Sequence, residues 1–336
     1  MLKKIEFMKI AVFSTKPYDK AYFEKHIKNS DYKFSFFEAS LNYDTANLTM
    51  GFDAVCIFVN DQVDEKTIKI LSKNGIKLIA LRCAGFNNLD VEAAKTEGIK
   101  VVRVPAYSPE AVAEHALALI LTLNRKTHKA YNRVREGNFS LNNLIGFNLS
   151  GKTVGVIGTG QIGATFCTIM KGFGCKIIAF DIHESEDLIN LGVTYVSLNE
   201  VFKQSDILSL HCPLNEHTKH IINETSIGQM KEGVMIINTS RGALINTSSV
   251  IQGLSEKKIG YLGIDVYEQE ENLFFEDLSE SIIQDDLILR LNSFPNVLIT
   301  SHQAYFTREA MDEITITTLK NIEAFDKNLE LENEVK

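Results

Sequence analysis

The chain has 336 residues, 45% of them hydrophobic and 23% charged, which is typical of a globular protein of two domains. A net charge of -8 and a pI near 5.6 provide no excess of basic residues to neutralise phosphates, so neither a nucleic acid nor an anionic membrane is expected as a partner. The five cysteines form no Cys-x-x-Cys pair and are interpreted as reduced, buried residues of a cytoplasmic protein.

The N-terminal segment MLKKIEFMKIAVF does not resemble a signal peptide, because Glu6 and Lys9 interrupt its hydrophobic stretch. The longest apolar segment, Ala111 to Leu123, contains Glu114 and His115 and is too short to span a bilayer. We therefore expect a soluble cytoplasmic protein without an export signal.

Short β-rich runs alternate with amphipathic helical patterns in the first third of the chain, as in a parallel sheet flanked by helices. The strands expected there, enough for one five-stranded sheet, are Lys9 to Ser14, Tyr32 to Phe37, Ala54 to Phe58, Leu78 to Arg82 and Lys100 to Val104. The tail after His302 has a helical pattern and is too short to form a domain, so we expect it to pack on this first sheet.

A helical segment from Pro109 to about Arg135 follows, and its alanine- and leucine-rich part is apolar on nearly every face. Such a helix must be buried. We expect its partner to be the other domain or a second subunit.

A second β-rich series begins at Lys152 and reads TVGVIG, KIIAFD, DILSLH, VMIINTS, IGYLGIDV and NVLITSH. Six strands in this rhythm match a Rossmann-type, doubly wound parallel sheet. The fold class is therefore α/β with two domains, the first sheet being smaller and flavodoxin-like. The expected boundaries are 1–106 plus 302–336 for one domain and 107–301 for the other.

A glycine motif of the form G-x-G-x-x-G joins the strand TVGVIG to a helical run, with Gly158, Gly160 and Gly163 as its glycines. The first glycine can make the tight turn, the second can admit a pyrophosphate, and the third can let the helix approach the strand. The next strand ends on Asp181, whose carboxylate can bind ribose hydroxyls and would repel a 2'-phosphate. The motif therefore favours NAD over NADP, and His211 with Cys212 is interpreted as part of the cofactor pocket.

Three later strands end in polar residues, which are Arg241, Asp265 and His302. Ligands of open α/β sheets bind at the carboxyl ends of the strands, so these side chains are expected to converge. Arginine can bind a carboxylate through two parallel hydrogen bonds, and histidine can donate and accept a proton near neutrality. The pattern indicates reduction of a 2-keto acid by Arg241 and His302, with a carboxylate that orients the imidazole.

Glu270 is the preferred orienting carboxylate, but spacing alone leaves Glu268 and Glu271 as alternatives. No group of His, Cys, Asp and Glu residues has convincing metal-ligand spacing, so no metal is expected.

Long motifs support this interpretation over almost the whole chain: FSTKPYD, ALRCAGFNNLD, RVPAYSPEAVAEHA, VGVIGTGQIG, HCPL, NTSRGALI, GIDVYEQE, NLFFED and SHQAYF. In these motifs the chain resembles the D-isomer-specific 2-hydroxyacid dehydrogenases. The resemblance implies that Arg241, Glu270 and His302 are the catalytic trio. It also implies NAD as cofactor, pyruvate and D-lactate as substrate pair, and a homodimer or homotetramer in which the helix after Pro109 is a dimer element.

The resemblance further implies a substrate domain, formed by the first domain and the tail, that is hinged onto the NAD domain. The substrate residues that it implies are Lys16, Ala84, Gly85, Tyr107 and Tyr305. Beyond the glycines, the NAD residues that it implies are Gln161, Ile162, Asp181, Cys212, Pro213, Thr218, Thr239, Ser240 and Asp265. Thr218 departs from the asparagine associated with its position.

Two alternatives remain at this point. One is another dehydrogenase of the same superfamily, of the glycerate or hydroxypyruvate reductase type. The other is an NAD-sensing protein like the transcriptional corepressors built on this fold, which can retain the same trio. Turnover of simple keto acids would discriminate the second alternative from an enzyme.

Overall fold

The computed structural model describes residues 7–27 and 32–336, apart from the side chain of Asn272, so the first six residues of the N-terminal segment lie outside the described part. The chain divides into two compact units, one formed by Met1–Ser108 and Phe306–Lys336 and the other by Pro109–Tyr305. The prediction put the second boundary before His302. In the structure His302 lies in the second unit, because its backbone N–H donates to the carbonyl oxygen of Asp265 at 2.7 Å.

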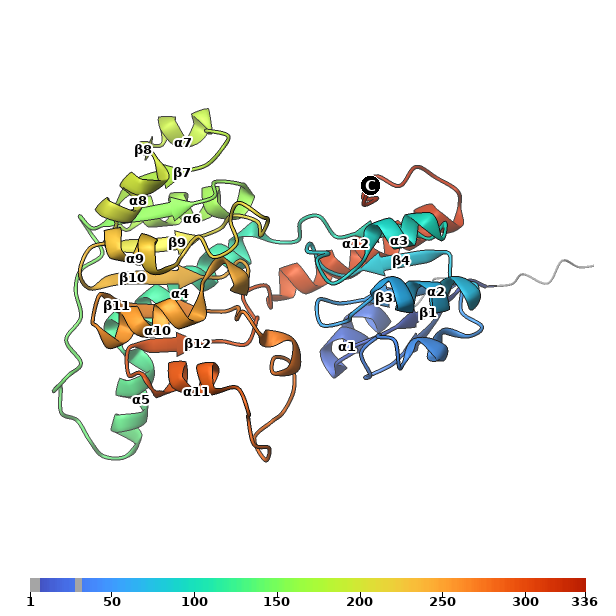
Figure 1. Cartoon of the computed structure of the whole chain (residues 1–336), viewed down its shortest axis with the longest axis horizontal. Coiled ribbons are helices and arrows are strands. Elements are labelled where there is room, and N and C mark those ends of the chain that lie inside the picture. Colours follow the sequence, from blue (N-terminus) through green and yellow to red (C-terminus); the bar gives the residue numbers. More distant parts are fainter. Residues whose placement is uncertain (1–6, 28–31) are drawn as a thin grey trace, which may run out of the picture. The chain divides into compact units, whose positions relative to one another are not determined.

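The first unit is built on a five-stranded parallel sheet with the order β2-β1-β3-β4-β5 (Figure 1). This is the flavodoxin-like order, and it confirms the predicted sheet. Each strand is one or two residues shorter than predicted: β1 Lys9–Val12, β2 Lys33–Phe36, β3 Ala54–Ile57, β4 Leu78–Leu81 and β5 Lys100–Arg103.

The C-terminal helix α12, Arg308–Asp326, packs against β4, β5 and helix α1 of this unit, as predicted for the tail. Its Ile322 is fully buried in one core with Ile10 and Leu78. The other helices of the unit are α1 Pro17–His26, η1 Ala46–Thr49, α2 Glu65–Lys73 and α3 Val91–Thr96.

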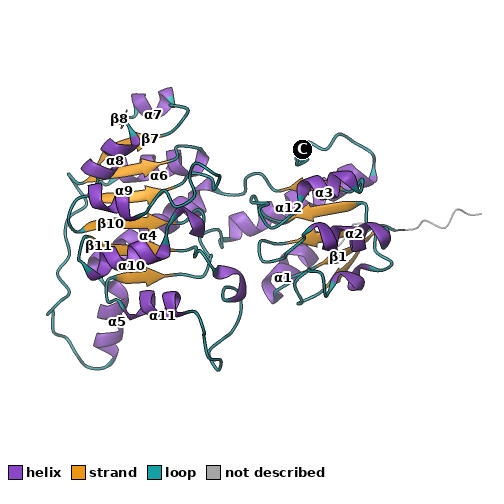
Figure 2. Ribbon diagram, in the orientation of Figure 1, coloured by secondary structure: helices purple, strands orange, loops and turns teal. Residues whose placement is uncertain are grey.

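The second unit contains a seven-stranded parallel sheet with the order β12-β11-β10-β9-β6-β7-β8 (Figure 2). The order reverses between β6 and β9, the switch point at which Rossmann-type sheets bind dinucleotides. The strands are β6 Thr153–Ile157, β7 Lys176–Phe180, β8 Val193–Tyr195, β9 Ile207–Leu210, β10 Val234–Asn238, β11 Ile259–Ile264 and β12 Val297–Ile299.

The prediction of six strands was wrong by one, because β8 was missed. It has three residues at the edge of the sheet, too few to show an alternating or continuous hydrophobic pattern. The central strands are buried on both faces and read as uninterrupted apolar runs.

Two cores cover the two faces of this sheet. Helices α4 Pro109–Arg125 and α6 Gln161–Gly172 supply one of them. The other is supplied mainly by α8 Leu198–Gln204, α9 Glu224–Gln229, α10 Thr247–Ser255 and α11 Asp286–Ser293. The remaining short elements are α5 Thr127–Arg135, α7 Glu186–Asn190, η2 Gly242–Leu244 and η3 Glu270–Asn272.

The segment Pro109 to Arg135 is not one helix. Lys126 adopts a left-handed conformation with φ of 51°, which ends α4 and starts α5. Within its own unit, α4 packs on β10, β11, β12 and α6. Its burial against the other domain or a second subunit stays a prediction. No helix in the described part of the chain is long and apolar enough to cross a membrane.

Candidate active site

The three glycines of the G-x-G-x-x-G turn have the geometry predicted for them. Gly158 has φ of 93°, and a Cβ atom on it would lie 2.5 Å from the backbone nitrogen of Cys212. A Cβ atom on Gly163 would lie 2.0 Å from the carbonyl oxygen of Gly158, so α6 can approach the strand only with glycine there. Gly160 faces open space, with no atom within 4 Å of such a Cβ. The turn therefore combines tight packing on two sides with room for a ligand at Gly160.

The start of α6 completes this turn. Gly160 is its N-cap, and Gln161 and Ile162 form its first turn, next to backbone N–H groups that have no partner within the helix. These groups and the positive end of the helix dipole favour a phosphate.

Asp181 follows β7 and lies beside this turn. Its Oδ2 accepts from the backbone N–H of Thr159 at 2.6 Å, and its Oδ1 accepts from the backbone N–H of His183 at 3.0 Å. Burial raises the pKa of Asp181, but these hydrogen bonds and one from the Thr159 hydroxyl outweigh it, so the pKa lies below its ordinary value. The carboxylate is therefore charged at neutral pH and would repel a 2'-phosphate.

We expect Asp181→Ala to raise the KM for NADH. It should also weaken the preference for NADH over NADPH by about tenfold or more, which corresponds to a difference of about 1.4 kcal/mol in binding free energy. Initial rates with the two cofactors measure this. Asp206→Ala is a matched control, because Asp206 also accepts a backbone N–H, that of Thr153, but at the other end of β6. An unchanged preference in Asp181→Ala would contradict the assignment.

In the second unit, two buried polar atoms near the carboxyl ends of the strands have no hydrogen-bond partner among the described residues. They are Nδ1 of His211, after β9, and Oγ1 of Thr239, after β10. Burial lowers the pKa of His211 to about 3, so its ring is neutral, and its Nε2 is 2.8 Å from the Ser209 hydroxyl. Buried polar groups are normally satisfied, so these atoms fit a polar ligand such as NAD.

The other predicted cofactor residues lie on loops of the same unit. Cys212 and Pro213 follow β9, and the Ser240 hydroxyl donates to the carbonyl oxygen of Cys212 at 2.7 Å, which ties two of these loops together. The Thr218 hydroxyl donates to the carbonyl oxygen of Pro213 at 2.7 Å and accepts from the Asn215 N–H. The hydroxyl proton of Thr218 is therefore donated within its own turn.

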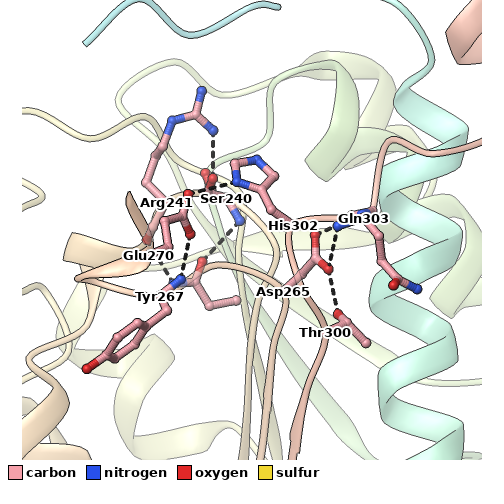
Figure 3. A network of polar contacts seen from close by, with 10 residues as sticks. Ser240, Arg241, Asp265, Tyr267, Glu270, Thr300, His302 and Gln303 are labelled. Atoms are coloured by element: carbon pink, nitrogen blue, oxygen red, sulfur yellow. Dashed lines mark hydrogen bonds and ion pairs between the residues drawn. The ribbon is translucent and has the colours of Figure 1, made fainter. Parts of the chain in front are cut away.

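His302 and Glu270 form a pair, with His302 Nδ1 2.8 Å from Glu270 Oε1. The second oxygen of Glu270 accepts from the backbone N–H of Tyr267 at 2.8 Å, which fixes the carboxylate. Arg241 lies beside this pair in Figure 3. The structure thus brings together the three side chains that the sequence assigned to catalysis, and Glu270, not Glu268 or Glu271, is the carboxylate that contacts the imidazole.

The turn that carries His302 is strained. His302 has φ of 53°, a conformation that costs on the order of 1–3 kcal/mol for a residue with a side chain. Asp265, which is fully buried, holds this turn by accepting from Thr300 Oγ1 and from the N–H groups of Gln303 and Ala304 (Figure 3). Asp265 was predicted to line the NAD site, which stays a prediction; its hydrogen bonds within the described part of the chain support the histidine turn.

Arg241 is half-buried at the start of η2, and its Nη1 donates to the carbonyl oxygen of Ser240 at 2.6 Å. Among the described residues no carboxylate forms an ion pair with it, and no other acceptor bonds its guanidinium. Because a guanidinium offers parallel donors that match a carboxylate, the nitrogens of Arg241 that have no partner among the described residues fit a carboxylate from a ligand.

The remaining predicted substrate residues lie in both units. Tyr305 is 7% exposed at the end of the second unit. In the first unit, Lys16 precedes α1 and donates its backbone N–H to Asp19 Oδ2 at 3.0 Å, and Tyr107 follows β5. Ala84 and Gly85 follow β4, where Arg103 holds their loop through the Ala84 carbonyl oxygen at 2.7 Å.

Sequence reasoning missed several residues that support the site. Asn238 orients the arginine loop through its amide, which donates to the Arg241 carbonyl oxygen at 2.8 Å and accepts from the Ser240 N–H. His115 on α4 contacts Thr300 at 3.0 Å and Asp265 at 3.4 Å. Asn238 ends an apolar strand, and His115 stands beside Glu114 in a helix that is apolar elsewhere; that contrast is the signal that could have found them.

A Rossmann-type sheet with this glycine turn, and a histidine–carboxylate pair at the ends of its strands, defines the protein as an NAD-binding oxidoreductase. Residues 117–304 match the D-isomer specific 2-hydroxyacid dehydrogenase, NAD binding domain. The chain is 52% identical to the D-lactate dehydrogenase of Escherichia coli K12 over 98% of this chain and 100% of that protein.

Two solved structures are also similar. The pyruvate reductase of Chlamydomonas reinhardtii has a TM-score of 0.92 at 45% identity, with 97% of this chain and 98% of that chain covered. The D-lactate dehydrogenase of Aquifex aeolicus, complexed with NAD and lactic acid, has a TM-score of 0.84 at 36% identity, with 95% and 96% covered. The chain belongs to the D-isomer specific 2-hydroxyacid dehydrogenases.

Proposed function

We propose that the protein is an NAD-dependent D-lactate dehydrogenase that interconverts pyruvate and D-lactate, with Arg241, Glu270 and His302 at the reacting centre. The observation that carries this proposal is a half-buried arginine without an anionic partner among the described residues, beside a histidine that is bonded to a carboxylate (Figure 3). Such a site can bind a carboxylate and protonate a neighbouring oxygen.

Arg241 binds the carboxylate of the keto acid in this proposal. Its planar guanidinium offers parallel donors, which lysine cannot provide. His302 gives its proton to the keto oxygen during reduction and takes it back during oxidation. Because Glu270 already accepts from Nδ1 of His302, the free Nε2 is the atom that exchanges this proton.

The cofactor assigned to the second unit is NAD, held by the Gly158–Gly163 turn, Asp181 and the loops after β9 and β10. NADH supplies the hydride when it is bound. His211 Nδ1 and Thr239 Oγ1, which are buried and have no partner among the described residues, are the atoms we assign to polar contacts with it.

Lys16, Ala84, Gly85, Tyr107 and Tyr305 are proposed as the remaining substrate residues. The backbone N–H groups of Ala84 and Gly85 would share the carboxylate with Arg241, and the two tyrosines would limit the space around C2. A pocket of this kind admits a methyl group more readily than a branched or aromatic one. One lysine is too little positive charge for a phosphorylated substrate.

A homodimer or homotetramer is part of the proposal. Its support is the family resemblance, which implies that the helix after Pro109 is a dimer element. A second support is a segment of the second unit, residues 131–145, that exposes Tyr131, Val134, Phe139, Leu141 and Ile145 by 52–85%. Exposed apolar side chains close together in sequence are typical of an interface. The cytoplasm is the proposed location, because the five cysteines are buried and form no disulfide in the described part of the chain.

A spectrophotometric assay with NADH and a panel of keto acids tests the proposal. Pyruvate should exceed phenylpyruvate in kcat/KM by about tenfold or more, and phosphohydroxypyruvate should be a poor substrate. Chiral chromatography of the product should show D-lactate. L-lactate, or a strong preference for hydroxypyruvate or a bulky keto acid, would overturn the D-lactate assignment, and absence of turnover with every keto acid would favour an NAD-sensing binding protein.

A further inference from the structure

Glu268 forms a polar cluster that the proposed mechanism does not use. Its Oε1 lies 2.5 Å from Nε2 of His220, and its Oε2 accepts from both the hydroxyl and the backbone N–H of Thr247, at 2.9 and 3.2 Å. Both carboxylate oxygens are thus engaged, each by a different segment of the chain. A solvated surface glutamate would not be constrained in this way, and Glu268 and His220 are only 23% and 32% exposed.

The cluster surrounds the turn that carries Arg241. This turn begins at η2, where a Cβ atom on Gly242 would lie 2.1 Å from the carbonyl oxygen of Tyr267 and 2.5 Å from the backbone nitrogen of Glu268. The backbone N–H of His220 donates to the Ala243 carbonyl oxygen at 2.8 Å. The arginine turn is therefore packed against the segment of Glu268 on one side and bonded to that of His220 on the other.

The backbone at His220 is itself held in place. His220 has φ of 53°, and the Asn223 side chain donates to its carbonyl oxygen at 2.8 Å. A short parallel bridge between Ile222 and Ile245 continues the contact to the far end of the arginine turn. A left-handed histidine persists only where its surroundings enforce it, so this segment has one preferred arrangement.

The segment of Glu268 also leads directly to the catalytic pair. Tyr267, its neighbour, donates its backbone N–H to Glu270 Oε2, and Glu270 contacts His302. A shift of the Glu268 backbone would therefore move the turn of Arg241 relative to Glu270. Burial raises the pKa of Glu268, but the hydrogen bonds from His220 and Thr247 outweigh it and hold the pKa below its ordinary value, so the cluster contains a carboxylate.

We propose that Glu268 and His220 are positioning residues that hold the Arg241 turn against the Glu270 turn and so set the affinity for the substrate carboxylate. The inference rests on the proposed function, because it takes Arg241 as the group that binds that carboxylate. Neither residue touches the substrate in this proposal. Their removal should therefore affect the binding of the keto acid more than that of NADH.

The test compares Glu268→Ala, Glu268→Gln and His220→Ala with the wild type. In Glu268→Ala, and similarly in His220→Ala, KM for pyruvate should rise by about tenfold, since small misplacements of a binding group have effects up to about 100-fold, while KM for NADH stays within about twofold. The Kd of oxamate, a non-reducible carboxylate analogue of pyruvate, should rise in parallel. Glu268→Gln should recover most of the loss, because its amide oxygen still accepts from Thr247.

Asp312→Ala is the matched control. Asp312 Oδ1 lies 2.8 Å from Nε2 of His26, so this change also removes a histidine–carboxylate pair, but in the first unit. The positioning role is overturned if KM for pyruvate in Glu268→Ala stays within twofold of the value in Asp312→Ala. It is also overturned if the KM values for pyruvate and NADH rise equally together with a lower Tm, since that pattern indicates general loosening.

Arg241→Lys separates a failure of this inference from a failure of the proposed function. If Arg241→Lys raises KM and Glu268→Ala does not, only the positioning role is wrong. If Arg241→Lys leaves KM for pyruvate unchanged, the function assigned to the arginine is wrong, and the positioning role of Glu268 is then wrong as well. If the roles of Arg241 and of Glu268 are both correct, Glu268→Ala should raise KM for pyruvate less in the Arg241→Lys background than in the wild type. The reason is that the effects of residues that act through one another are not additive.

Discussion

His302→Ala is expected to lower kcat for pyruvate reduction by a factor of about 100 or more over the whole working pH range, because a positioned acid typically contributes 10²–10⁴-fold. The imidazole is the proposed proton donor to the keto oxygen, and its Nδ1 is bonded to Glu270 at 2.8 Å. The KM for NADH should change little, since the nucleotide turn lies on other loops. Steady-state kinetics with purified enzyme measure both constants.

His26→Ala controls for the loss of a histidine that pairs with a carboxylate, here Asp312, and it should keep full activity. Glu270→Gln should lose less of kcat than His302→Ala, because the proton donor remains and only its orientation is weakened. Added imidazole should restore part of the rate in His302→Ala but not in Glu270→Gln. A full-rate His302→Ala enzyme would mean that the proton comes from another group.

Arg241→Lys is expected to raise KM for pyruvate by about 100-fold, with a smaller loss of kcat from misorientation. The guanidinium donates to the Ser240 carbonyl oxygen through Nη1, which orients the remaining nitrogens for a bidentate contact. Lysine keeps the charge but provides a single rotating ammonium group, so it loses the second hydrogen bond to a charged acceptor, worth about 1.5–3 kcal/mol.

Arg133→Lys is the matched control for this substitution. Arg133 also donates through Nη1 to a carbonyl oxygen, that of Asn142, but it lies within helix α5 and not on a loop that follows a strand of the sheet. Its KM for pyruvate should equal that of the wild type. The assignment of Arg241 would be refuted by a KM within twofold of the control, or by an equal rise in KM for keto compounds that carry no carboxylate.

Some features of the site could be predicted from local sequence because a local physical requirement imposes them. A glycine is needed at 158, where φ is positive, and at 163, where the helix lies against a carbonyl oxygen, so the spacing of the two is visible in the chain itself. Arg241 and His302 could be predicted since each follows an apolar strand, and parallel strands end at a common edge.

Other features depend on segments that are distant in sequence. The apolar pattern of α4 showed that the helix must be buried but not what covers it, and the left-handed Lys126 gave no signal in composition. Spacing could not separate Glu268 from Glu270, since both stand in one acidic run. The difference arises from their partners, His302 for Glu270 and His220 with Thr247 for Glu268.

The amino-acid sequence by itself thus determined the α/β class, the strands of both sheets except the short edge strand β8, the nucleotide turn and the residues available for acid–base chemistry. These follow from hydrophobic periodicity and local backbone geometry, which act over a few neighbouring residues. Only the tertiary structure decided that Asp265 supports the turn of His302 and that Glu268 braces the turn of Arg241. Hydrogen bonds between residues 20 to 50 positions apart form only after the sheet has brought its strand ends together.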